Sequence, residues 1–220
     1  MRRVLASLLA FAASALLLTG CQAELSETGE ALTVEQSEML AQTRFQVASR
    51  GEVVLEISAL PAADVGHLDL TVTLDPVEHL AWGTMDRGPE GIAVTQNVVF
   101  SPDLFATDAS GDWQTASFDA APSPALAVIF SLGADRPENA QLLRQSDARY
   151  LGAEDVDGET LSVFRLPSSD GSSTASTRMW LDADGRLRRL DAGGDEKLVV
   201  LLTDAEPEPK PEGLDGGVNG

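Results

Sequence analysis

In the run His67-Leu68-Asp69-Leu70-Thr71-Val72-Thr73-Leu74, polar and apolar side chains alternate without exception. Successive side chains of a β-strand point to opposite faces, so this segment has one apolar face and one polar face. The dipeptide Asp75-Pro76 follows directly and indicates a turn. The run therefore predicts a half-buried strand that ends at position 75.

Strand patterns continue on both sides of this run. The predicted neighbours are 53–59, where Val53, Leu55, Ile57 and Ala59 alternate with polar residues before Pro61, then 79–84, 92–100 and 112–118. Short strands in succession, joined by turns, are typical of an antiparallel meander. We therefore expect the first half of the domain to be a meander.

The middle of the chain has helical signals instead. Ser123-Pro124 precedes an apolar segment, Ala125 to Leu132, which Gly133 ends. Asp135-Arg136-Pro137-Glu138 has the composition of a second helix start, followed by Ala140, Leu142 and Leu143. Two short helices are expected to interrupt the strands.

The strand pattern resumes at 148–156 and returns at 161–166 through Asp157-Gly158, a dipeptide that favours a hairpin turn. A second hairpin is predicted at Asp182-Ala183-Asp184-Gly185, between strands 174–181 and 186–190, and a last strand at 198–202. The acidic turn also resembles the start of a calcium-binding loop. However, Arg186, Arg188 and Arg189 occupy later positions where such a loop needs ligands, so a hairpin is preferred.

The N-terminus has the layout of an export signal. Arg2-Arg3 precedes an uncharged segment from Val4 to Leu18, and Leu18-Thr19-Gly20-Cys21 resembles the lipobox of bacterial lipoprotein precursors. We expect residues 1–20 to be removed and Cys21 to carry a lipid anchor on the extracytoplasmic face of the cell membrane. The alternative is an ordinary signal peptide with an incidental cysteine nearby. Cys21 is the only cysteine, so it forms no internal disulfide.

The remaining boundaries follow from local signals. Residues 21–32 are predicted to be a tether, and Thr33-Val34-Glu35-Gln36 forms a capping-box pattern before a helix at 34–48. One folded domain then covers 33–204. The Pro- and Glu-rich end, 205–220, is predicted to be a disordered acidic tail.

The charge of the chain excludes several partners. The formal net charge is −20, which disfavours nucleic acid and, through the surface as a whole, anionic lipid headgroups. We therefore expect the membrane contact to come from the anchor on Cys21.

Catalytic groups are sparse. His67 and His79 are the only histidines, no G-x-S-x-G or Ser-x-x-Lys pattern occurs, and a single cysteine excludes a cysteine-based metal site. We expect a protein that is not an enzyme and that needs no cofactor or metal.

Two stretches carry a family resemblance. Residues 152–160, Gly-Ala-Glu-Asp-Val-Asp-Gly-Glu-Thr, and residues 178–187, Arg-Met-Trp-Leu-Asp-Ala-Asp-Gly-Arg-Leu, resemble the back half of actinobacterial LppX/LprG-type lipoproteins of the LolA-like superfamily. The resemblance covers about 33–204. It implies an α+β fold in which a curved antiparallel half-barrel wraps over short helices, with a cavity for lipid or acylated ligands between them.

We therefore expect a lipoprotein that binds an apolar ligand, such as a lipid, a glycolipid or the acyl chain of another lipoprotein, for transport or display. The candidate cavity wall consists of the apolar strand positions Val53, Leu55, Ile57, Leu68, Leu70, Val72, Ile92 and Val94. The alternative is a lipoprotein without enzymatic activity that binds an envelope protein or modulates a sensor, with docking that weakens as salt is added.

Overall fold

The computed structural model describes residues 25–62, 66–88, 94–108, 113–115, 128–167, 177–193 and 198–211. The predicted signal segment, Cys21 and Ile92 lie outside these ranges. Within them, strands predominate and helices are few. The predicted α+β class is confirmed.

The strands form two antiparallel meanders that share one sheet. The first comprises β2 (Val53–Ala62), β3 (Gly66–Asp75), β4 (Leu80–Gly88), β5 (Val94–Ser101), β6 (Leu104–Asp108) and β7 (Trp113–Thr115). The second comprises β8 (Arg149–Val156), β9 (Glu159–Arg165), β10 (Arg178–Leu181), β11 (Leu187–Ala192) and β12 (Leu198–Thr203). Pairing of β12 with β2 joins the two meanders, and the short β1 (Glu30–Ala31) pairs with β8. The strand patterns predicted neither β1 nor β6.

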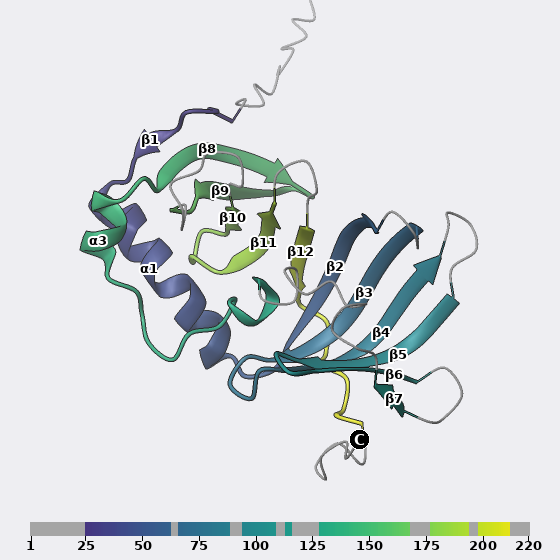
Figure 1. The fold of residues 1–220 in the computed structure, drawn as a ribbon. Coiled ribbons are helices and arrows are strands. Elements are labelled where there is room, and N and C mark those ends of the chain that lie inside the picture. The colour runs from purple at the N-terminus through teal and green to yellow at the C-terminus, as the bar shows by residue number, and fades with distance from the viewer. Residues whose placement is uncertain are drawn as a thin grey trace, which may run out of the picture.

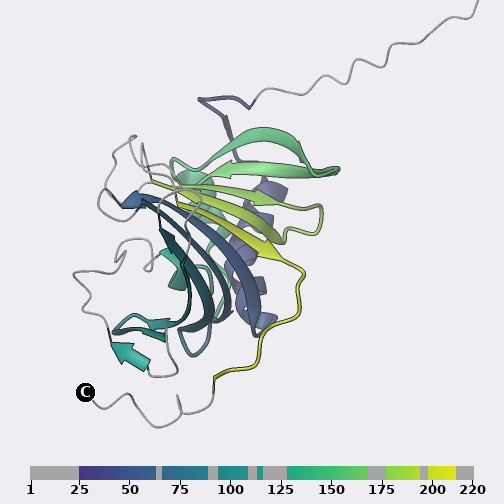
Figure 2. The same cartoon turned by 90° about the vertical axis from the view of Figure 1, so that its right-hand side faces the viewer.

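The sheet is curved and remains open. Its strand order runs from β1 through β8–β12 and β2–β6 to β7, and the two end strands do not pair with each other. Figures 1 and 2 show the strands bending around one side, on which α1 (Val34–Ser49) lies. We call this the inner face and the opposite side the outer face.

The helices differ in how well their starts could be predicted. In α1 the expected capping box is present: the Gln36 backbone N–H donates to Thr33 Oγ1 and the Thr33 N–H donates to Gln36 Oε1. The second mid-chain helix, α3 (Ala140–Gln145), begins later than the cap pattern at 135 predicts. The Asn139 side chain accepts hydrogen bonds from the backbone N–H groups of residues 141 and 142 instead. Of the helix expected at 125–132, only 128–130 is described as helical.

Both predicted hairpins are confirmed. Asp157 and Gly158 have φ values of 52° and 86°, as a two-residue hairpin turn requires, and β8 pairs with β9 around them. In the second hairpin, Asp182 Oδ1 accepts from the backbone N–H groups of Asp184 and Arg186, each at 2.9 Å. The carboxylate that could have begun a calcium loop thus stabilises the turn.

A continuous apolar row crosses the inner face. It passes from strand to strand through directly paired residues: Tyr150, Phe164, Met179, Leu190, Val200, Ile57, Leu70 and Met85. Apart from Tyr150, which packs against it, these side chains belong to one core cluster with Leu40, Ala41 and Val47 of α1. The register of the sheet therefore places the apolar residues of both meanders on a single surface.

A smaller apolar cluster lies on the outer face of β8–β10. It contains Leu151, Leu161, Val163 and Trp180, and Leu25 packs against it. The Ser26 N–H donates to the Leu151 carbonyl at 2.8 Å. Much of the predicted tether is therefore docked along the edge strand.

The C-terminal segment also differs from its prediction. Residues 205–211, expected to be disordered, continue from β12 across the outer face of β3 and β4. The Glu208 N–H donates to Thr73 Oγ1, and Trp82 Nε1 donates to the Glu208 carbonyl, both at 2.9 Å. The Lys210 Nζ lies 3.1 Å from Glu78 Oε2. Residues 212–220 lie outside the described ranges.

Candidate ligand site

Most of the predicted wall residues lie together on the inner face. Leu55 is paired with Val72 and Ile57 with Leu70, and Val53 lies at the end of the same set. All five are buried, with exposures between 0 and 8%. The sheet thus gathers them on one surface, as the alternating patterns imply.

The other three predicted wall positions are not part of this buried set as the structure describes it. Leu68 lies on β3 opposite Arg87, and its side chain is not described. Val94 is 55% exposed at the end of β5. Ile92 lies outside the described residues.

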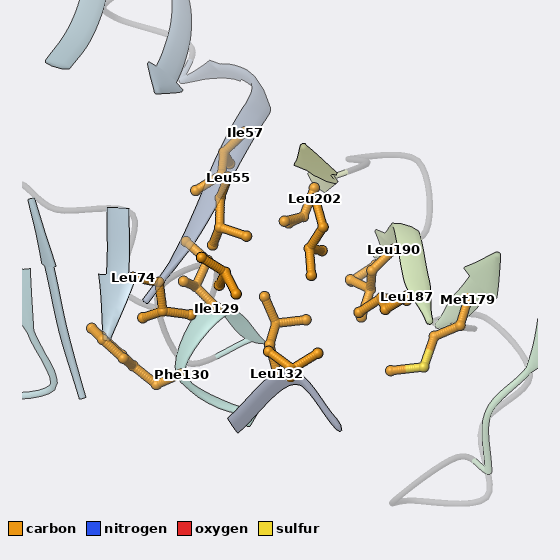
Figure 3. Packing of buried hydrophobic residues seen from close by; sticks show 14 of the residues in the cluster. Leu55, Ile57, Leu74, Ile129, Phe130, Leu132, Met179, Leu187, Leu190 and Leu202 are labelled. Atoms are coloured by element: carbon orange, nitrogen blue, oxygen red, sulfur yellow. The ribbon is translucent and has the colours of Figure 1, made fainter. Parts of the chain in front are cut away.

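The inner face is closely packed where the structure describes it. Ile129, Phe130 and Leu132 from the mid-chain segment project onto Leu55, Leu74 and Leu202 of the sheet (Figure 3). Ile129 and Leu132 are 1% and 0% exposed. The five buried wall residues therefore line a side-chain core here, and their role in a ligand cavity stays a prediction.

An open pocket of about 620 Å³ lies beside this core, between α1, α3 and the end of β9. Its lining consists of Arg44, Ala134, Asp135, Arg136, Pro137, Glu138, Asn139, Leu142, Leu143, Ser146 and Pro167. The volume falls within the range of pockets that hold small molecules.

Arg44 builds the polar side of this pocket. From α1 its Nε donates to the Ser131 carbonyl at 2.5 Å, and one terminal nitrogen lies 3.3 Å from Glu138 Oε1. The backbone also connects the elements, because the Ala134 N–H donates to the Arg44 carbonyl and the Glu138 N–H to that of Ala41. These bonds hold 131–138 along α1 and so shape the pocket.

The apolar side comes from α3. Leu142 is 63% exposed at the pocket, whereas Leu143 is 8% exposed and also belongs to the core cluster. The pocket therefore joins an apolar surface, continuous with the core through Leu143, to a rim carrying Arg44, Arg136, Asp135 and Glu138. Such a lining suits a ligand with an apolar part and a polar end.

The sequence patterns did not point to this pocket. Asp135-Arg136-Pro137-Glu138 drew attention only as a helix start, and the pocket arises because tertiary bonds place that segment beside α1. The adjacent leucines Leu142 and Leu143 were the available signal, but a sequence alone does not show which leucines a fold leaves uncovered.

The described pocket lining contains no histidine. His79 is exposed in the turn before β4, and its ring meets the Phe130 ring edge-on with centroids 6.2 Å apart. Across the described ranges, no three His, Cys, Asp or Glu side chains are close enough to hold a metal ion. Among those same residues, no helix is long and apolar enough to cross a membrane.

The fold and pocket define an α+β half-barrel protein with an amphipathic pocket beside its helices. No protein-family model matches the sequence, and no curated protein matches it.

Solved structures with a similar arrangement include LprF from Mycobacterium bovis, 14% identical with a TM-score of 0.49, the match covering 80% of this chain and 96% of that one. The lipoprotein LppX from Mycobacterium tuberculosis is 15% identical with a TM-score of 0.47, covering 76% and 93%. A LolA-superfamily protein from Nitrosomonas europaea is 13% identical with a TM-score of 0.29, covering 82% and 96%.

Proposed function

We propose that this chain is a membrane-anchored extracytoplasmic lipoprotein that binds an apolar ligand, such as a lipid, a glycolipid or an acyl chain, for transport or display. The anchor is the lipid on Cys21, for which the run Leu18-Thr19-Gly20-Cys21 is the support. The protein acts by binding and needs no catalytic group.

The 620 Å³ pocket beside the inner face is the observation that carries this proposal. Leu143 belongs both to its lining and to the core cluster, so an apolar chain in the pocket would contact surface that continues into the half-barrel. Each buried methylene contributes about 0.8 kcal/mol, so a long acyl chain gains affinity from area alone.

The polar rim fits the other end of such a ligand. Arg136 is exposed, and Arg44 lies deeper, held by the Ser131 carbonyl and by Glu138. A guanidinium group donates readily to carboxylate or phosphate oxygens. A ligand with an anionic or hydroxyl-bearing head would therefore place its head at the rim and its chain against Leu142 and Leu143.

The proposal is tested by titrating the mature chain with cis-parinaric acid, a fluorescent fatty acid. Leu142→Glu places a charge in the apolar lining, and we expect the Kd to rise about tenfold or more. Val77→Glu is the matched control, because Val77 is 71% exposed in the turn after β3 and takes no part in the pocket. The control is expected to bind the probe as the unaltered chain does.

An equal rise in the Kd of Leu142→Glu and Val77→Glu would contradict a ligand site at this pocket. The second candidate function, a lipoprotein that binds an envelope protein, is favoured by the close packing of Ile129, Phe130 and Leu132 on the inner face. It predicts that the unaltered chain does not bind the fatty acid. The same titration therefore separates the two functions.

A further inference from the structure

A second row of paired residues runs along the outer face, and its charge changes from one end to the other. From β8 to β5 it consists of Arg149, Arg165, Arg178, Asp191, Val199, Ser58, Asp69, Asp86 and Thr95. The end nearest β1 is basic, and the end at β3 and β4 is acidic.

Three arginines, Arg149, Arg165 and Arg178, lie directly opposite one another on neighbouring strands, which is unusual in so acidic a chain. Its net charge is −20, and like charges directly opposite each other on neighbouring strands destabilise a sheet. Arg149, Arg165 and Arg178 are all half-buried. We call them the arginine row.

Two carboxylates near the arginine row have other partners. Asp191, opposite Arg178, lies 2.7 Å from Arg189, and this hydrogen bond raises the pKa of the Arg189 guanidinium above its usual value. Glu154 accepts from Trp180 Nε1 at 2.7 Å. In the part of the chain that the structure describes, no ion pair joins the arginine row to a carboxylate.

The N-terminal segment is docked at this same place. Arg165 donates to the backbone carbonyls of Glu27 at 3.3 Å and Thr28 at 3.5 Å. Leu25 packs on the neighbouring outer cluster of Leu151, Leu161, Val163 and Trp180. Figure 1 shows β1 and β8 at one extreme of the molecule, away from β3–β7.

The free length between this surface and the anchor is short. Only three residues separate Cys21 from Leu25. At about 3.3 Å per extended residue, the Cα of Leu25 stays within about 13 Å of that of Cys21. A lipid on Cys21 would therefore hold the outer face of β8–β10 close to the bilayer, while Asp69 and Asp86 lie at the far end of the outer row.

We propose that the outer face of β8–β10 lies against the membrane that carries the anchor, and that the arginine row binds headgroup phosphates of anionic lipids there. The inference rests on the proposed anchor at Cys21. The overall charge of the chain repels such lipids, but at physiological salt charges are screened beyond about 8 Å, so the arginine row and the distant acidic residues act separately. Arginine also forms paired hydrogen bonds with phosphate oxygens.

The test uses the chain from Cys21 onward, with its single thiol coupled to a maleimide lipid in vesicles. One set of vesicles contains phosphatidylcholine alone, and the other contains phosphatidylcholine with phosphatidylglycerol. Arginines are modified with phenylglyoxal, and peptide mass spectrometry gives the rate at each position. Arg50 and Arg144 are exposed on the helical side of the chain, outside the pocket lining, and serve as internal controls.

On the anionic vesicles we expect Arg149, Arg165 and Arg178 to react about fivefold more slowly than on the neutral ones, the factor that corresponds to about 1 kcal/mol per arginine at an anionic surface. The control arginines should keep their rates. Equal rates on both vesicles would overturn the inference, as would equal protection of the controls. Protection on neutral vesicles by inorganic phosphate alone would also overturn it, since the site would then bind a soluble anion.

Chemical coupling stands in for the natural lipid. If the coupled chain shows no protection, the proposed contact between the arginine row and the bilayer is disproved. The proposal that Cys21 carries a lipid is not affected by that result. If protein from its own host has no lipid on Cys21, the anchor proposal is wrong. The modification rates of the coupled chain still show whether the arginine row contacts an anionic bilayer.

Discussion

Gly83 controls how closely β4 approaches β3. It is paired with Val72, and a Cβ built at this position would overlap the Thr71 carbonyl oxygen and lie 2.7 Å from the Val72 Cα. Backbone atoms cannot move aside as the end of a flexible side chain can. The position therefore excludes every side chain, although it lies within a strand where alternation suggests an ordinary residue.

We predict that Gly83→Ala lowers the free energy of unfolding by about 1–3 kcal/mol, the usual cost of overpacking. Urea denaturation followed by circular dichroism measures this difference. Gly51→Ala is the control, because Gly51 has a φ of 77° but no atom within 4 Å of a built Cβ. If Gly83→Ala lowers the free energy of unfolding less than Gly51→Ala does, the close approach of β4 to β3 does not require a glycine.

At the residue scale, sequence reasoning succeeded where the chemistry is local. Asp157-Gly158 forms its turn through its own backbone preferences, and the cap at Thr33 depends on a side chain three residues away. Asn139 rather than Asp135 caps α3 because the preceding segment is bonded to α1, a tertiary effect that spacing does not reveal.

Among the elements, the C-terminal segment departs most from its composition. A Pro- and Glu-rich stretch cannot form its own core, which is why disorder was expected. Thr73 and Trp82 supply the missing partners, 135 and 126 residues earlier in the sequence. Long-range hydrogen bonds of this kind leave no local pattern.

We predict that a chain ending at Asp204 is less stable by about 2 kcal/mol, because it loses two hydrogen bonds to Glu208 worth about 1 kcal/mol each. Trp82, which is 1% exposed in the intact protein, should become accessible and shift its fluorescence to longer wavelength. Thermal unfolding and emission spectra measure both effects. The control ends at Pro211 and keeps every described contact; if both truncations melt together, 205–211 does not stabilise the sheet.

For the whole molecule, alternating patterns predicted the meanders, but the pairing of β12 with β2 that joins them came only from the structure. That pairing makes one inner apolar surface from two halves of the chain, with the pocket beside α1 and α3. Five of the eight predicted wall residues lie on this surface, whereas the pocket itself depends on how 131–138 packs. A pattern of apolar residues identifies a buried face more readily than it identifies an opening.

The central claim, a lipid-anchored protein that carries an apolar ligand, is tested most directly by native mass spectrometry of the protein purified from its own host. We predict an N-terminal peptide that begins at Cys21 and bears acyl groups, together with a second, noncovalently bound lipid that leaves the protein on collisional activation. An unmodified Cys21 would contradict the anchor. Repeated recovery of the protein with no bound lipid would contradict ligand carriage.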